Sequence, residues 1–204
     1  QEDIEITKNI KDIQTAGYYS AALMGNGDLW TWGSMAKGES YSSSQVSQDT
    51  EQKPAVFMTD VKEFVLGTNC YAAIKNDGTL WMWGVNFNGQ LGTGSNELNQ
   101  LTPTKVLDDV SKVYLLDSYT FGCVAAVTTK GELNMWGSNG SGQLGIGNQK
   151  EQNTPQKVDL ANVKKVSMDG MTTSALTTDG KMYIWGANGT YGLGLEMNEE
   201  TGQY

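Results

Sequence analysis

The sequence contains no histidine and only two cysteines, Cys70 and Cys123. Histidine is the commonest general base and metal ligand near neutral pH, so its absence removes the side chain on which many catalytic and metal sites depend. The two cysteines cannot form a CxxC pair, because they stand far apart in the chain. We therefore predict a non-enzymatic protein with no catalytic residue, no metal site and no bound cofactor.

Long apolar runs and concentrated basic runs are also missing. The first ten residues, QEDIEITKNI, lack the apolar core of a secretory signal peptide, and no run is long enough to span a bilayer, so membrane insertion is not expected. The 14 Lys and Arg residues are outnumbered by 23 Asp and Glu residues, giving a net charge of −9. That balance argues against a phosphate-neutralising surface, and nucleic acid is not a predicted partner.

What the sequence does contain is an internal repeat. Four Trp-Gly pairs lie 51, 53 and 49 residues apart, at Trp32-Gly33, Trp83-Gly84, Trp136-Gly137 and Trp185-Gly186. A glycine stands five residues before each of these tryptophans, and in three of the four copies it is preceded by Asn or Asp. Such pairs between apolar strands predict a hairpin with a type I′ turn, in which both central residues have positive φ.

Two other features recur in the same register. An alanine stands ten residues before each tryptophan (Ala22, Ala73, Ala126 and Ala175), and we expect these small residues to face a narrow central axis. Short β-branched runs, with a proline at the start of a strand in three copies, add two more strands to each unit.

The predicted fold class is therefore all-β, with four β-propeller blades of about four antiparallel strands each. The blades form a single repeat domain over residues 1–204, with repeats at about 1–50, 51–100, 101–152 and 153–204.

The order of these features resembles the repeat of the regulator of chromosome condensation family. It is clearest in NDGTLWMWGVNFNGQLGTG at Asn76 to Gly94 and in KGELNMWGSNGSGQLGIG at Lys130 to Gly147. The first copy departs from it, because a polar segment replaces the Gly-Gln-Leu-Gly sequence. The resemblance implies a seven-bladed ring, whereas this chain has four units. We expect either part of such a ring or a partial ring whose open edges are covered by self-association.

The resemblance also places the cysteines and tryptophans. Cys70 and Cys123 occupy the same position in adjacent blades, where the family usually carries histidine, and equivalent positions on neighbouring blades are expected to be too far apart for a disulfide. We predict two free buried thiols. The four repeated tryptophans are predicted to pack between blades, whereas Trp30 and Trp81 vary between copies and are predicted to be partly exposed.

The glycine-rich sequence after each tryptophan could be mistaken for a phosphate-binding loop. Neither a following helix nor a lysine in the Walker position accompanies it, so we interpret these glycines as turn residues with positive φ. Within this sequence only Asn86, Phe87 and Asn88, which differ from the matching segments, remain open to a contact role.

The predicted functional surface is formed by the variable loops that precede the alanine-bearing strands. Converging loops rich in aromatic residues provide a broad surface for a protein partner. The candidate partner-binding residues are Tyr18, Tyr19, Asn69, Tyr71, Tyr119, Phe121 and Met171.

Two other functions stay open from the sequence. The repeats could be a structural spacer in a larger protein of the cell surface, or they could have the guanine nucleotide exchange activity of the family's founding member. The Gly-, Asn- and Thr-rich texture resembles bacterial secreted and surface proteins with such repeats, which implies an extracellular or cell-surface location. A cytoplasmic location stays open, because two unpaired cysteines are compatible with it.

Overall fold

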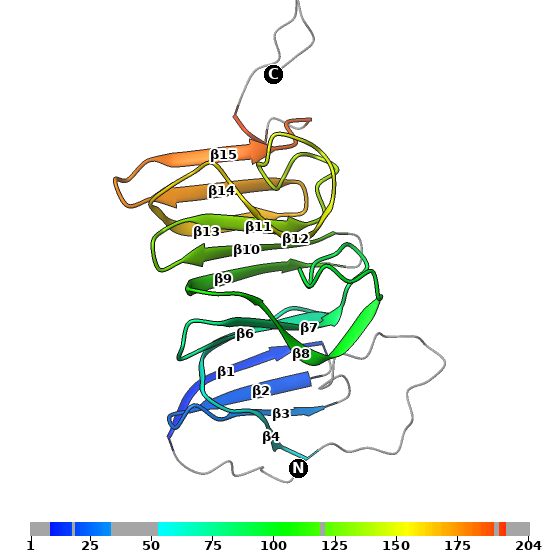
Figure 1. Ribbon diagram of the computed structural model, residues 1–204, viewed down its shortest axis with the longest axis vertical. Helices are drawn as coiled ribbons and strands as arrows, with labels where there is room; N and C mark the ends of the chain where they lie inside the picture. The colour runs from blue at the N-terminus through cyan, green and yellow to red at the C-terminus, as the bar shows by residue number, and fades with distance from the viewer. Residues whose placement is uncertain (1–8, 18, 34–52, 119–120, 190–191, 195–204) are drawn as a thin grey trace, which may run out of the picture.

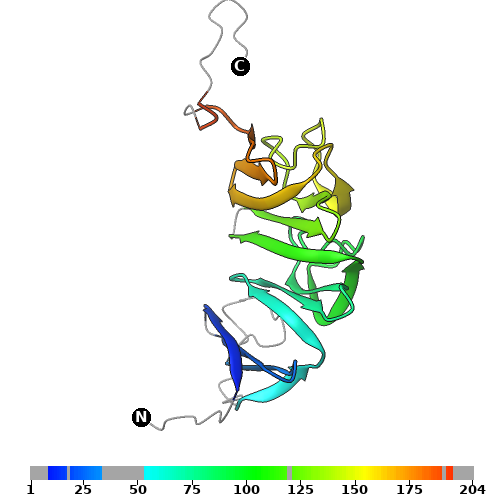
Figure 2. The same cartoon turned by 90° about the vertical axis from the view of Figure 1, so that its left-hand side faces the viewer.

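The computed structural model describes residues 9–17, 19–33, 53–118, 121–189 and 192–194. Within these ranges the chain forms four antiparallel sheets, which stack one after another along the long axis of the molecule (Figure 1). The turned view shows that the stack is curved (Figure 2). Each sheet is one propeller blade, as the repeat predicts.

The strands follow the chain order within each blade. The first blade contains β1 (Ile10–Ala16), β2 (Tyr19–Met24), β3 (Leu29–Gly33) and β4 (Ala55–Met58). The second contains β5 (Val61–Leu66), β6 (Cys70–Lys75), β7 (Leu80–Val85) and β8 (Asn99–Leu107). The third contains β9 (Val110–Asp117), β10 (Gly122–Thr128), β11 (Leu133–Gly137) and β12 (Gln152–Lys157). The fourth contains β13 (Val163–Asp169), β14 (Thr172–Thr177) and β15 (Met182–Gly186).

The predicted hairpin joins the second and third strands of every blade, but its turn is not of type I′. In the first blade Gly27 N donates to Met24 O (3.0 Å), Met24 N donates to Asp28 O (2.8 Å), and Gly27 has a φ of +89°. Asn26 is not among the residues with positive φ. The loop is therefore a three-residue turn that ends in a glycine bulge, and only the glycine needs the left-handed conformation.

This hairpin also connects neighbouring blades. The carbonyl of Gly27 accepts a hydrogen bond from Val61 N (2.9 Å), the first residue of the next blade, and Gly78 accepts one from Val110 N (2.9 Å) in the same way. Asp60 and Asp109, which precede these valines, both have positive φ. The Asn-Gly or Asp-Gly signal therefore marks a contact between blades as well as a turn.

The core lies between the blades. Successive residues of β6 alternate between its two neighbours: Tyr71 and Ala73 pack with the first blade, whereas Cys70, Ala72 and Ile74 pack with the third. The prediction that the repeated alanines face the central axis is wrong, because they lie on the second strands. The first strands β1, β5, β9 and β13 contact one another in order and line the inside of the curve.

The prediction that the repeated tryptophans pack between blades holds fully for two of the four. Trp83 and Trp136 are fully buried between blades, whereas Trp32 and Trp185, in the outer blades, are half-buried. Trp30 and Trp81 are half-buried, as predicted. Cys70 and Cys123 are free and buried. Burial raises the pKa of the Cys123 thiol to about 12.

The two outer blades each leave one face without a neighbouring blade. On the first blade Ile10, Ile13 and Val56 are exposed, although the residues equivalent to Ile10 and Ile13 in the second blade are buried. On the outer face of the fourth blade Met182 and Ile184 are exposed, whereas Tyr183, also exposed, pairs with Ala175 on the side toward the third blade. No helix in the described ranges is long and apolar enough to cross a membrane.

Candidate functional site

The strand connections gather at two opposite ends of the blades. We call the connections at 67–69, 86–98, 118–121, 138–151, 170–171 and 187–189 the loop end, as far as they are described. The tight turns at 25–28, 76–79, 129–132 and 178–181 form the hairpin end. Backbone bonds hold the loop end together: Val85 N donates to Asn69 O (2.8 Å), and Ser138 N donates to Gly122 O (2.8 Å).

The repeated Trp-Gly pair is required by this arrangement. A Cβ atom added at Gly84, which has a φ of +114°, would lie 2.4 Å from the carbonyl oxygen of Asn69. The glycine therefore lets the third strand leave the blade directly beside the preceding loop. The pair is a structural marker of the loop end.

The predicted contact residues lie in different environments. Met171, between β13 and β14, is 47% exposed, and Phe121, between β9 and β10, is half-buried with its ring beside Gly170, so these loops of the third and fourth blades lie side by side. Tyr18 and Tyr119 lie outside the described residues.

The expectation that Tyr19, Asn69 and Tyr71 are exposed loop residues is wrong, because all three are buried. The second strands begin at Tyr19 and Cys70, earlier than predicted, so the side chains of Tyr19 and Tyr71 turn into the core between the first two blades. Their rings meet edge to face with centroids 4.5 Å apart. Burial raises the pKa of both phenols well above the usual range, and neither hydroxyl has a hydrogen-bond partner among the residues that the structure describes.

Asn69 has a structural role that involves a residue absent from the predictions. The carboxylate of Asp117, at the end of β9, reaches across from the third blade and accepts hydrogen bonds from Asn69 N and from Cys70 N (2.9 Å) through Oδ2. Burial raises the pKa of this carboxyl, and the two backbone N–H groups oppose that shift. Asp117 does not recur in the other blades, so the repeat does not point to it. Its role depends on contacts between blades that only the fold creates.

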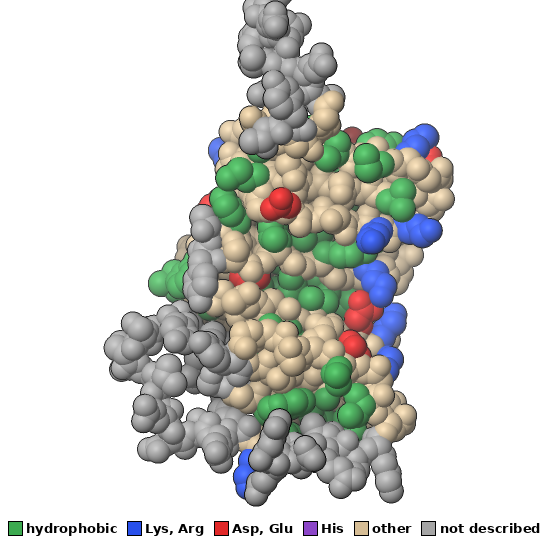
Figure 3. All heavy atoms as spheres, turned by 180° about the vertical axis from the view of Figure 1, so that it is seen from behind, with side chains coloured by type: hydrophobic (Ala, Val, Ile, Leu, Met, Phe, Trp, Pro, Cys, Tyr) green, Lys and Arg blue, Asp and Glu red, His purple; other side chains and the backbone are tan. Residues whose placement is uncertain are grey.

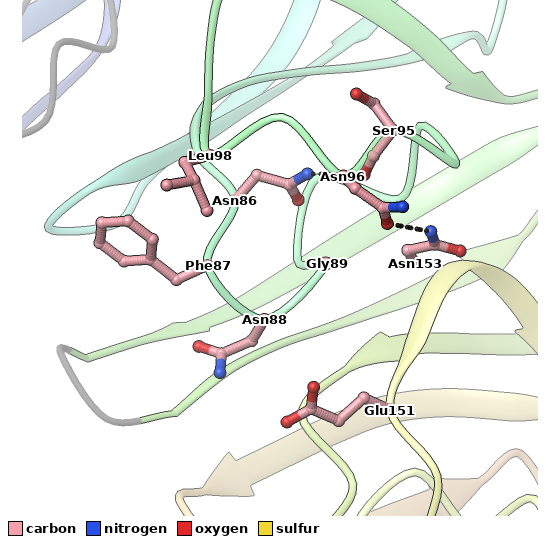
Figure 4. Close-up of a pocket in the computed structure, with 9 residues that line it drawn as sticks. All are labelled: Asn86, Phe87, Asn88, Gly89, Ser95, Asn96, Leu98, Glu151 and Asn153. Carbon is pink, nitrogen blue, oxygen red and sulfur yellow. Dashed lines mark hydrogen bonds between the residues drawn. The ribbon is translucent and has the colours of Figure 1, made fainter.

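An open pocket of about 420 Å³ lies in the connection after β7 and reaches the third blade (Figure 4). Phe87 and Leu98 form its apolar part and are 53% and 57% exposed. Asn96, Glu151 and Asn153 contribute polar groups, and Asn153 Nδ2 donates to Asn96 Oδ1 (3.2 Å). The pocket thus combines two exposed apolar side chains with a polar margin.

Asn86 also lines this pocket, but its hydrogen bonds are structural. Its amide nitrogen donates to Ser95 O and Glu97 O (both 3.0 Å), and its Oδ1 accepts from Leu91 N (3.0 Å). Asn139 makes the same set of bonds in the third blade. Of the three residues that the sequence leaves open to a contact role, Phe87 and Asn88 retain that possibility, and Asn86 belongs to the fold.

The Gly-Gln-Leu-Gly sequence joins one blade to the next. The indole Nε1 of Trp136 donates to the carbonyl of Gln90 (2.9 Å), and Trp185 donates to Gln143 in the same way (2.9 Å). A Cβ atom at Gly92 would lie 2.5 Å from Trp136 Nε1, so the glycine leaves room for the indole. These contacts confirm the interpretation of the sequence as architecture.

Among the described residues, no group of three or more His, Cys, Asp or Glu side chains is arranged to hold a metal ion. The site is therefore described by its shape and apolar surface.

Comparison with known proteins identifies the repeat. Residues 77–115 and 130–176 match the model of the "Regulator of chromosome condensation (RCC1) repeat". The chain is a member of the RCC1 repeat family. The matched residues include the hairpin glycines Gly78 and Gly131 and the tryptophans Trp83 and Trp136.

Two RCC1 relatives from Arabidopsis thaliana align with most of the chain. The mitochondrial RCC1 domain-containing protein RUG3 is 27% identical over 157 residues, which are 76% of this chain and 35% of RUG3. The ultraviolet-B receptor UVR8 is 30% identical over 139 residues, which are 68% of this chain and 31% of the receptor. The chain thus spans about a third of the length of these curated relatives.

Solved structures support the same fold. Yeast RCC1 (Prp20), in a crystal structure with Kap60, superposes with a TM-score of 0.74 at 20% identity and covers 94% of this chain and 46% of its own. Human WBSCR16 gives a TM-score of 0.71 at 20% identity, over 87% of this chain and 47% of its own. At this identity the likeness establishes the fold.

Proposed function

We propose that this chain is a non-enzymatic propeller module that binds another protein through its loop end. The observation that supports this proposal is the location of the large apolar side chains that are exposed. In the described residues, those outside the two outer blade faces are Phe87, Leu98, Met171 and Tyr183, and the first three belong to the loop end. Exposed apolar groups with polar neighbours are typical of protein interaction sites.

The pocket after β7 supplies the centre of the proposed surface. Phe87 and Leu98 offer apolar area, and Asn88, Asn96 and Glu151 surround them with hydrogen-bonding and charged groups. An apolar centre with a polar margin is the usual anatomy of a protein interface. Phe121 and Met171 extend the proposed surface toward the fourth blade. Tyr18 and Tyr119 stay predicted contact residues.

Two solved structures of one similar protein support a protein partner. Yeast RCC1 (Prp20) was solved bound to Kap60, and a second structure of Prp20p was described together with its binding to Gsp1p and histones. These statements concern those proteins, and the partner of this chain is a separate question. A nucleotide exchange role has less support, because this chain lacks the histidines that the family resemblance implies for the partner face.

Capture from a cell lysate tests the proposal. We expect immobilised parent chain to retain specific proteins, and the variant Phe87→Ser/Leu98→Ser to lose most of them, because the central apolar contacts of an interface carry much of the binding energy. Quantitative mass spectrometry measures the recovery, and a captured protein is then purified for a direct affinity measurement.

The matched control is Met182→Ser. Met182 is 71% exposed but lies on the face of the last blade, away from the loop end. Equal recovery with the parent chain and the double variant would contradict the loop-end proposal, as would loss of the same proteins with the control.

A spacer role in a larger protein is the second candidate. It is favoured by the apolar side chains on both outer blade faces, including Ile13 and Ile184, which further repeats could cover. A bacterial source, secretion and a cell-surface location stay predictions, because the relatives described above come from a plant, yeast and human.

A further inference from the structure

The first strand of every blade has one edge without a strand neighbour. Each of β1, β5, β9 and β13 stands at the end of its sheet, and together they line the inside of the curved stack (Figure 2). Free backbone N–H and C=O groups of such an edge can pair with an extended chain. The inside of the curve therefore offers backbone groups that the blades do not use among themselves.

A β-bulge recurs near the start of each of these strands. The pairing shifts leave one extra residue in each strand: Lys11 in β1, Lys62 in β5, Ser111 in β9 and Lys164 in β13. A bulge leaves its extra residue out of the ladder and redirects the side chain. The bulge therefore places a lysine on the inside of the curve in three of the four blades.

These lysines belong to a longer basic row. Figure 3 shows Lys side chains following one another along one edge of the molecule. Part of the row is tied into the protein: Lys11 Nζ of the first blade donates to Lys62 O (2.9 Å), and Lys112 Nζ of the third blade pairs with Glu63 of the second (2.8 Å). The carboxylate of Glu63 therefore offsets the charge of Lys112.

Other lysines on the third and fourth blades make no ion pair. Among the described residues, Lys130, Lys164 and Lys165 have no ion pair, whereas nearby Glu132 and Asp179 already pair with Lys157 and Lys181. Lys130 and Lys164 thus stand side by side at one cleft without an ion pair, in a chain whose net charge is −9.

A cleft of about 270 Å³ lies in the same place. Lys112, Lys130 and Lys164 line it together with hydroxyl groups of Thr129 and Thr178. No Asp or Glu side chain lines it. Ammonium and hydroxyl groups are donors that fit carboxylate oxygens.

We propose that this cleft binds an extended acidic segment of a protein partner. The lysines would pair with carboxylate side chains, and the free edges of β9 and β13 would pair with the backbone of the segment. Nucleic acid fits less well, because a long polyanion would also meet the acidic remainder of a chain with 23 Asp and Glu residues. This surface lies toward the hairpin end and does not depend on the loop-end proposal.

Fluorescence anisotropy with a fluorescein-labelled oligoglutamate peptide tests the site. We expect the full chain to bind the peptide, with an affinity that falls as NaCl is added, because salt screens exposed charges. The variant Lys130→Gln/Lys164→Gln should bind about fivefold more weakly, since two exposed pairs of modest strength are lost.

The matched control is Lys53→Gln/Lys150→Gln, which removes the same charge from two exposed lysines outside the cleft. It should retain the parent affinity within about twofold, because the cleft is intact. Phe87→Ser should also retain it, which separates this test from that of the loop end.

Three results would overturn the proposal. They are no binding of the peptide to the parent chain, equal weakening in both lysine variants, and binding of a DNA oligonucleotide of similar charge in place of the peptide. Thermal unfolding of each variant shows that the exposed substitutions leave the fold intact.

Discussion

At the scale of single residues, the contact between Gly92 and Trp136 explains why the glycine-rich sequence follows the tryptophans. Trp136 fills the space beside Gly92 and donates its indole N–H to the carbonyl of Gln90. Gly92 has a φ of +69°, so the position requires glycine both for its left-handed backbone and for the absence of a side chain beside the indole. The apparent binding loop is a connector between blades.

Replacement of Gly92 by alanine should therefore destabilise the fold. The new Cβ would meet the indole at 2.5 Å and would also stand in the left-handed region. We expect the free energy of unfolding to fall by about 2 to 4 kcal/mol, from backbone strain and overpacking together. Urea denaturation followed by tryptophan fluorescence measures the change.

The control for this prediction is Gly147→Ala. Gly147 has a φ of +77°, but an added Cβ would meet no atom within 4 Å. Only the backbone strain remains, and the expected loss is about 1 kcal/mol. Equal losses for the two variants would mean that the indole moves aside freely and that the contact with Gly92 is unimportant.

At the scale of strands and turns, the sequence predicts the blades well. The Trp-Gly, alanine and hairpin glycine positions recur because each blade makes the same contacts with its neighbours, so about four strands per blade follow from the repeat. The strands β4, β8 and β12 complete the preceding blade, whereas the predicted repeat boundaries place most of their residues in the next unit. The turn type was missed because Asn26 and Gly27 fit more than one hairpin geometry. Tyr71 was misplaced because β6 begins one residue earlier, which puts its ring on the face of Ala73.

The features missed entirely are those that occur across blades or in one copy. Asp117 appears only in the third blade, and its bonds to Asn69 and Cys70 join residues 47 and 48 positions apart. In the sequence Lys62 and Lys164 look like ordinary exposed residues. Only the strand pairing shows that they occupy equivalent bulge positions in the second and fourth blades.

Asp117 supports a prediction about the connection between the second and third blades. Asp117→Ala leaves the N–H groups of Asn69 and Cys70 without their carboxylate acceptor. The free energy of unfolding should fall by about 1 to 3 kcal/mol, the usual cost of an unpaired buried polar group. Chemical denaturation at neutral pH measures this loss.

Asp117→Asn keeps an oxygen acceptor without the charge and tests the pH dependence. The pKa of Asp117 is raised in the folded state, so its contribution favours folding most below the unfolded pKa and is lost as the pH rises through the folded pKa. The asparagine variant should therefore gain stability relative to the parent chain between acidic and neutral pH. A constant difference across this range would contradict the role of burial.

At the scale of the whole molecule, the stack has two different apolar ends. Ile10 and Ile13 lie on the first blade, where the second blade has the buried residues Val61 and Phe64, whereas Met182 and Ile184 lie on the opposite face of the last blade. These ends correspond to the two sides of an ordinary contact between blades. Contact between unlike ends of two copies is heterologous and leads to rings or open chains.

The 204-residue chain on its own should therefore associate as its concentration rises. We expect sedimentation equilibrium to give an average mass above 22.1 kDa at high concentration, because two faces that resemble a buried blade contact are available. The variant Ile13→Glu/Ile184→Glu should stay at 22.1 kDa, since a charged group on either face would have to lose its hydration without a partner.

The variant Phe87→Ser distinguishes association through the ends of the stack from association through the loop end. Phe87 is as exposed as many residues of the outer faces but lies at neither end of the stack, so its replacement should leave the association of the parent chain unchanged. If Phe87→Ser abolished association and the double glutamate variant did not, copies would meet through the loop end. The surface proposed for a protein partner would then be the surface on which the chain binds itself.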